Sequence, residues 1–235
     1  MPKYVAPTLG VFLHKIAIDY VRHGYYRYYQ VKVNENKIDQ LERIDRKIVK
    51  SYKVTYHHTT RSLRKKRGEA NIAYVRFGLD IILLATDGEL PKGIKADQFK
   101  DVREKPIGYK GYTIEVRRIM RKGAIEDFTP ILRLSLRRHK AIRKQLLSIS
   151  LHNRQKVVYY FQRISPFMYP GILHQKWYLL KTVNKKRKAG GLKPISWIEA
   201  KKWKYTKGYE PTTPLPSSHH SPMMHMCAEI PLGGI

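Results

Sequence analysis

The chain has 235 residues, with 47 Lys and Arg against 18 Asp and Glu, and a formal net charge of +29. Its hydrophobic residues make up 42% and its aromatic residues 11%, so the chain is long and apolar enough to bury a core in one or two domains. The positive charge is spread along the chain instead of lying in one amphipathic helix. Such a distribution favours nucleic acid over a membrane surface or an ordinary enzyme substrate.

The single cysteine, Cys227, excludes an intrachain disulfide and fits a reducing compartment. No run of about twenty apolar residues is present that would cross a bilayer. Residues 1–24 are an apolar lead-in, which His14, Lys15 and Asp19 interrupt too early for a signal peptide. We therefore expect a cytoplasmic protein without a membrane partner.

Residues 25–120 have the pattern of a sheet domain that begins with a tyrosine-rich strand from Tyr25 to Val33. Alternation along this strand places Tyr26, Tyr28 and Lys32 on one face. Aromatic rings beside cations on an open sheet stack unpaired bases in several RNA-binding folds. The alternative is that both tyrosines are half-buried strand residues, because tyrosine favours strands in any case.

Two helices and further strands follow this first strand. Apolar residues from Ile38 to Tyr52 recur at helical spacing, and Thr59 to Gly68 has the pattern of a short basic helix with a threonine cap and a glycine stop. The cations of the basic helix that we expect to hold phosphates are Arg61, Arg64, Lys65, Lys66 and Arg67. A solvated basic run is the alternative.

The remaining strands of this domain are a hairpin and one later segment. Residues 71–77 and 79–86 predict a hairpin about Gly78, and Tyr109 to Arg118 predicts a further strand. The predicted class is α+β, with a small antiparallel or mixed sheet, helices on one face and the opposite face open to a ligand. A ferredoxin-like arrangement is compatible with this order.

A helical domain over residues 128–205 is the most basic part of the chain. From Phe128 to Ile198 there is no Asp or Glu, while Lys and Arg supply sixteen positive charges. One apolar series runs from Leu132 to Val157, and after a turn a second helix is supported by Ile172, Trp177 and Val183 among others. The segment from Ser196 to Glu199 has a capping-box pattern that predicts a last short helix. The predicted phosphate-binding cations here are Arg137, Arg138, Lys140, Arg143, Lys144, Lys185, Lys186, Arg187 and Lys188. A one-signed region repels itself unless an anion shares the site.

Residues 206–235 form a tail rich in Pro, Ser and Gly that is predicted to be disordered. The tail contains four metal-ligating side chains, namely His219, His220, His225 and Cys227. Their spacing does not match a zinc site, so we expect no metal site there.

Several segments resemble those of a group of uncharacterised small basic bacterial proteins. The similar segments are His23-Gly24-Tyr25-Tyr26, Ala70-Asn71-Ile72-Ala73-Tyr74-Val75-Arg76-Phe77-Gly78, Leu83-Leu84-Ala85-Thr86-Asp87-Gly88, Gly111-Tyr112-Thr113-Ile114 and the stretch from Val183 to Leu192. The resemblance covers roughly residues 20 to 195. It implies no function, because none is known for the group.

The leading hypothesis is a protein that binds RNA or DNA through phosphates, without a cofactor. The first alternative is a nuclease, with Mg²⁺ as its metal, or a tyrosine nicking enzyme of a mobile element or plasmid. Its candidate catalytic residues are Asp87, His58, Tyr159 and Tyr160. His57 and His58 are adjacent and would point to opposite faces of a strand, which argues against a shared metal. The second alternative is a structural component of a ribonucleoprotein.

Overall fold

The computed structural model describes residues 2–91, 94–121 and 124–201, which form two compact units. Within these ranges, the sheet unit comprises the chain up to Ile107 and Ile114–Pro130. The helical unit comprises Gly108–Thr113 and the chain from Ile131 to Lys201. The predicted tail and its histidines lie outside the described residues.

The lead-in segment of the sheet unit is helical. Helix α1 (Leu9–His14) begins where the Thr8 hydroxyl accepts a hydrogen bond from the Val11 N–H at 3.3 Å. It continues as the π-helix η1 (Lys15–Tyr20) and the 3₁₀ turn η2 (Val21–His23), and it ends at Gly24, whose φ of +90° suits a glycine.

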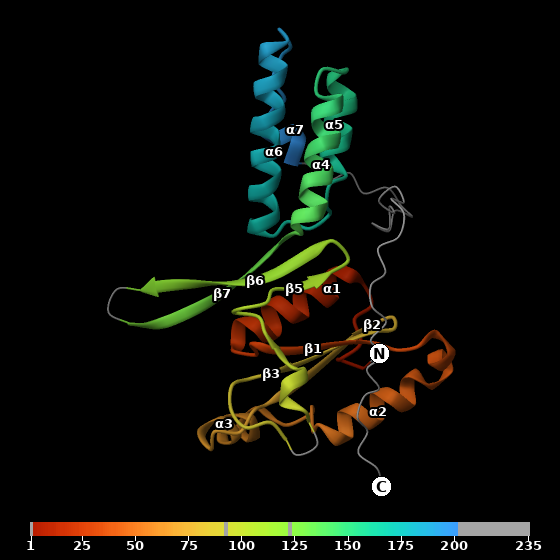
Figure 1. The fold of residues 1–235 in the computed structure, drawn as a ribbon, viewed down its shortest axis with the longest axis vertical. Helices are drawn as coiled ribbons and strands as arrows, with labels where there is room; N and C mark the ends of the chain where they lie inside the picture. The colour runs from red at the N-terminus through yellow and green to blue at the C-terminus, as the bar shows by residue number, and fades with distance from the viewer. Residues whose placement is uncertain (1, 92–93, 122–123, 202–235) are drawn as a thin grey trace. The chain divides into compact units, whose positions relative to one another are not determined.

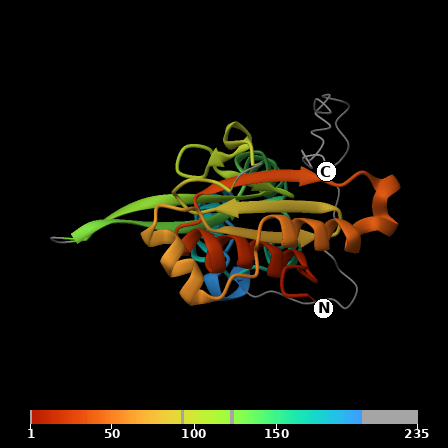
Figure 2. The ribbon, with the colours of Figure 1, turned by 90° about the horizontal axis from the view of Figure 1, so that it is seen from below.

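A four-stranded antiparallel sheet follows, in the order β2-β3-β1-β4. The strands are β1 (Arg27–Lys32), β2 (Ile72–Phe77), β3 (Asp80–Ala85) and the short β4 (Lys100–Asp101). The predicted hairpin about Gly78 is confirmed, with Phe77 opposite Asp80 and a φ of +59° at Gly78. Strand β3 pairs with β1 on one edge and with β2 on the other (Figure 2), and its residues from Ile81 to Ala85 are buried.

Helices cover both faces of this sheet, whereas the sequence predicted them on one face. On one side, Ile48 of α2 (Leu41–Ser51) shares a hydrophobic cluster with Tyr74 and Leu83. On the other side, α1 and η1 pack on β2, and the ring centroids of Phe12 and Phe77 lie 5.8 Å apart. Figure 1 shows α1 on one side of the strands and α2 on the other. Both faces of a sheet this apolar need covering, and the lead-in helix supplies the second cover.

Three further elements connect these parts of the sheet unit. They are the 3₁₀ helix η3 (Glu35–Gln40), the basic helix α3 (His58–Lys66) and the 3₁₀ turn η4 (Ala96–Gln98). The predicted basic helix is therefore present, and it begins at His58, one residue earlier than expected.

A second sheet has the order β5-β6-β7, with β5 (Ile107–Tyr109), β6 (Tyr112–Arg121) and β7 (Ala124–Leu134). Lys110 and Gly111, with φ of +42° and +78°, form the turn between β5 and β6. Strand β7 reaches Leu134, so Leu132 lies in a strand and not in the helix that its apolar spacing predicted.

The helical unit contains α4 (Leu136–Ile149), α5 (Arg154–Gln162), α6 (Pro170–Ala189) and α7 (Trp197–Lys201). Local sequence explains each helix start. The Ser135 and Asn153 side chains cap α4 and α5, and Pro170 opens α6. The predicted capping box of Ser196 and Glu199 is confirmed, since each side chain accepts a hydrogen bond from the other residue's N–H.

Helix α4 packs against α5 and α6, and α7 packs against the same two helices. Leu146, Phe161 and Val183 are fully or almost fully buried between them. The expected α+β class, a small antiparallel sheet followed by basic helices, is confirmed. Among the helices that the structure describes, none has the length and apolarity needed to cross a membrane.

Candidate nucleic-acid interface

The helical unit has an extreme charge balance. Its described residues include eighteen Lys and Arg side chains and a single carboxylate side chain, Glu199. That carboxylate is already used, because it pairs with Arg154 at 2.7 Å and caps α7 through Ser196. Among its described residues, the unit therefore supplies no second acidic side chain for its other cations.

Some of these cations hold the unit together. The buried Arg187 donates hydrogen bonds to the carbonyl oxygens of Ser150 at 2.8 Å and of Lys193 at 3.0 Å. Arg138 lies 4.7 Å over the Tyr112 ring and donates to the Ile164 carbonyl oxygen at 3.1 Å. Both were predicted to bind phosphates. Arg187 has an internal structural role, and the guanidinium of Arg138 is likewise engaged with its own unit.

Helix α4 presents cations to solvent on the side opposite its packed side. Arg137, Lys140 and Lys144 recur at helical spacing and are exposed, and Arg143 lies beside them. The packed side carries Ile142, Leu146 and Ile149. Helix α4 therefore buries one apolar side, and four of its cations are exposed to solvent.

The C-terminal half of α6 continues this pattern. Lys185 and Lys188 are exposed, one turn apart, without a partner among the described side chains. Lys186 is also exposed, and its amine donates to the carbonyl oxygen of Leu147 in the last turn of α4 at 3.0 Å. Lysines in the last turn of a helix also interact favourably with its C-terminal partial charge.

The basic helix α3 of the sheet unit divides in the same way. Arg61 donates to the Val54 carbonyl oxygen at 2.8 Å, and Arg64 pairs with Glu69 at 2.7 Å. Lys65, Lys66 and Arg67 are exposed at the end of the helix. Of the five α3 cations predicted to bind phosphates, the three at the end of the helix are therefore the ones exposed to solvent.

The tyrosines of β1 do not lie on an open surface. Tyr28 is 3% exposed, its hydroxyl lies 3.0 Å from the carbonyl oxygen of Lys105, and burial raises its pKa. Tyr26 is partly buried, with the Arg103 guanidinium 4.7 Å from its ring centroid and Phe128 against its edge. Lys32 is exposed but pairs with Glu35 at 3.1 Å. The expectation of an open aromatic sheet face is therefore wrong at Tyr28.

The candidate catalytic residues do not form a recognisable centre. The Asp87 carboxylate accepts two hydrogen bonds from Arg103, which also binds Asp101. His58 lies in the first turn of α3 and not in a strand. Tyr159 and Tyr160 belong to α5 of the helical unit, whereas Asp87 and His58 belong to the sheet unit.

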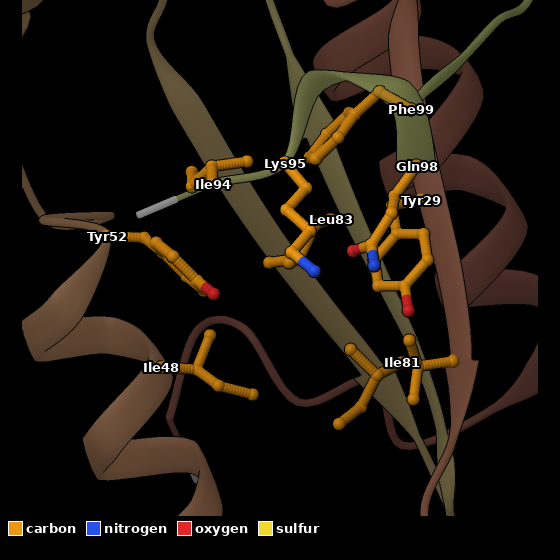
Figure 3. A pocket seen from close by; sticks show the side chains of 10 residues that line it. Tyr29, Ile48, Tyr52, Ile81, Leu83, Ile94, Lys95, Gln98 and Phe99 are labelled. Atoms are coloured by element: carbon orange, nitrogen blue, oxygen red, sulfur yellow. The ribbon is translucent and has the colours of Figure 1, made fainter. Parts of the chain in front are cut away.

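No metal site stands out in the described ranges. No group of three or more His, Cys, Asp or Glu side chains is placed there to hold a metal. A small pocket between β1, β3, the end of α2 and residues 94–99 is lined by Tyr29, Tyr52, Leu83 and Phe99 among others (Figure 3). Its lining contains no carboxylate or histidine, so it offers no acid or base for hydrolysis.

An aromatic cluster on α6 was missed in the sequence, where Trp177 was counted in the apolar series that predicted the helix. Trp177 is 36% and Tyr178 52% exposed, and His174 is exposed beside them. Lys181 follows one turn later, with its amine 3.6 Å from the Trp177 ring centroid. The spacing along the sequence could have revealed this cluster, because positions 174, 177, 178 and 181 lie on the helix face opposite Ile172, Leu179 and Val183.

A smaller pair of the same kind lies on α5. Tyr159 is 52% exposed, and the Arg163 guanidinium lies 3.9 Å from its ring centroid. The candidate nucleophile Tyr159 is therefore an exposed ring beside a cation.

Comparison with known proteins yields no assignment. No protein-family model matches the chain, and no curated protein matches it significantly.

Proposed function

We propose that this chain is a nucleic-acid-binding protein that holds the phosphate backbone of RNA or DNA with the exposed cations of its helical unit. The observation that supports the proposal is the ratio of eighteen cations to one carboxylate side chain in that unit. Phosphate binding by Lys and Arg supplies most of the affinity of proteins that bind nucleic acid without sequence preference.

The exposed side of α4 is the best-defined part of the proposed interface. Arg137, Lys140 and Lys144 are spaced so that they occupy successive turns on one side. Their extended side chains lie within about 10 Å of helix rise, a reach that suits consecutive phosphates of one strand. The exposed cations at the end of α6 would add contacts within the same unit.

The test is the salt dependence of binding to a labelled 20-nucleotide RNA, a DNA of the same sequence and the DNA duplex. We expect log affinity to fall linearly with log salt, and each of Arg137→Gln, Lys140→Gln and Lys144→Gln to reduce the slope by about 0.7–0.9. Lys32→Gln is the matched control, because Lys32 pairs with Glu35 in the sheet unit. Its slope should equal that of the unmodified chain.

A nearly flat salt titration, or no binding to any of the three probes in dilute buffer, would refute the proposal. Equal losses in Lys32→Gln and in the α4 variants would also contradict it, because only net charge would then matter.

A further inference from the structure

One side of α6 carries aromatic rings in its first half and lysines in its second half. We call it the aromatic–lysine stripe, and its members are His174, Trp177, Tyr178, Lys181, Lys185 and Lys188. All six are exposed and, at 3.6 residues per turn, fall within about 100° of the helix circumference. The stripe contains no acidic residue.

The rings of the stripe contact one another. The His174 and Trp177 rings are nearly parallel, at 14°, with centroids 6.3 Å apart. Tyr178 meets both edge-on, at 4.7 Å from His174 and 5.2 Å from Trp177. Lys181 lies over the Trp177 ring. This arrangement keeps the rings in a fixed orientation at the surface.

Packing of the helical unit does not require these rings. Helix α6 already buries a full apolar side through Ile172, Leu179, Leu180 and Val183. An exposed Trp–Tyr pair on the opposite side costs solubility and contributes little to the core. Clustered exposed aromatic side chains of this kind commonly mark a binding surface.

We infer that the aromatic–lysine stripe binds unpaired bases of a single-stranded nucleic acid. Bases stack on Trp177 and Tyr178, and the adjoining phosphates contact Lys181, Lys185 and Lys188. Stacking platforms of aromatic rings beside a cationic track are the general means by which single strands are bound without sequence readout. The inference rests on the proposed function and specifies its partner as single-stranded.

Charge complementarity decides between this occupant and a protein partner. The lysines lie on the same side as the rings, and the described part of the unit has only Glu199 to offset its cations. A second copy of the chain would bring equal positive charge to the surface and would be repelled. A single-stranded nucleic acid has flat bases that can stack on the rings of the stripe and phosphates that can pair with its lysines.

The experiment uses the full chain and three probes of equal length: a 20-nucleotide single strand, its duplex, and an abasic single strand that keeps the phosphates but lacks bases. Trp177→Ala should weaken binding of the intact single strand by about 10-fold or more. It should leave the abasic strand and the duplex unchanged and should not alter the salt slope. Trp177→Phe should recover most of the loss, because it restores a ring.

Ile198→Ala is the matched control, since Ile198 is a 70% exposed apolar side chain on α7, outside the stripe and outside the exposed side of α4. It should bind all three probes like the unmodified chain. Lys185→Gln and Lys188→Gln should reduce the salt slope for the intact and the abasic single strands alike. Unchanged duplex affinity in Trp177→Ala shows that the variant is folded.

Equal affinity of Trp177→Ala and the unmodified chain for the intact single strand would overturn the inference while leaving the proposed function intact. An equal loss on all three probes would overturn it as well. Self-association that disappears in Trp177→Ala, with single-strand affinity unchanged, would make the stripe a protein interface instead. Failure of the unmodified chain to bind any probe would refute the proposed function itself.

Discussion

Lys176 lies on the packed side of α6, only 1% exposed, and its amine has no hydrogen-bond partner among the described residues. Burial lowers the pKa of this amine from 10.5 to about 8. Burial without a hydrogen-bond partner destabilises the charged form of a lysine amine. At neutral pH the buried Lys176 therefore lowers the stability of the folded state. Of the many cations of the helical unit, this one is turned inward without compensation.

Replacing Lys176 by Met should raise the free energy of unfolding at pH 7 by roughly 1–3 kcal/mol, because the long side chain stays while the charge is removed. In the unmodified chain the unfolded state keeps this proton up to pH 10.5, whereas the folded state loses it near pH 8. The unfolded state thus binds more protons in this window, and stability rises with pH across it.

Urea denaturation at several pH values between 7 and 10.5 measures the effect. The Met variant should lack the part of the rise that the Lys176 amine contributes. A Met variant less stable than the unmodified chain at pH 7, with the same pH dependence, would show that the amine is compensated in the folded state.

At the level of elements, the first turn of α6 lies directly against the end of β7. A Cβ added at Gly171 would lie 2.5 Å from the Leu132 carbonyl oxygen and 2.8 Å from a side-chain carbon of Ile131. Gln175, one turn later, exchanges two hydrogen bonds with the backbone of Leu134, at 2.8 and 3.0 Å. The glycine and the glutamine together fix where α6 begins and therefore how its stripe is presented.

Gly171→Ala should destabilise the helical unit by about 1–3 kcal/mol, because the backbone carbonyl oxygen of Leu132 that the new Cβ meets cannot move aside as a side chain could. This is the opposite of the usual gain for Gly→Ala in a helix. Gly108→Ala is the control, since a Cβ there meets nothing within 4 Å. Thermal unfolding followed by circular dichroism compares the two, and equal melting temperatures would show that α6 can shift at no cost.

At the scale of the whole chain, a net charge of +29 makes the folded state repel itself. A polyanion that binds only the folded state both stabilises it by mass action and relieves this repulsion. The ribonucleoprotein alternative and the binding proposal both predict this stabilisation by nucleic acid. Measuring it therefore tests whether the folded chain binds nucleic acid, which both hypotheses require.

The 20-nucleotide single strand, added at about 100 times its Kd, should raise the melting temperature by about 5–10 °C. Inorganic phosphate at the same ionic strength is the control for simple screening and should give a smaller shift. Differential scanning fluorimetry measures both. Superimposed melting curves with and without the strand would contradict the proposal.

Periodicity along the sequence was sufficient for the elements that depend on local pattern. The hairpin about Gly78, the basic helix α3 and the Ser196–Glu199 capping box were all predicted, because turn, cap and helical spacing are encoded within a few neighbouring residues. The acid-free stretch was likewise visible directly. Charge sign and local geometry do not depend on distant parts of the chain.

Burial could be decided only by tertiary structure, because it depends on which distant segment covers a face. Tyr28 and Arg187 appeared available in the sequence, and each is covered or bonded by residues that local pattern does not identify. Trp177 belonged to the apolar series of the predicted helix and is exposed, because other side chains of α6 fill the packed side. The sequence by itself determined that the chain carries an excess of positive charge, and the fold determined which of those charges and rings reach water.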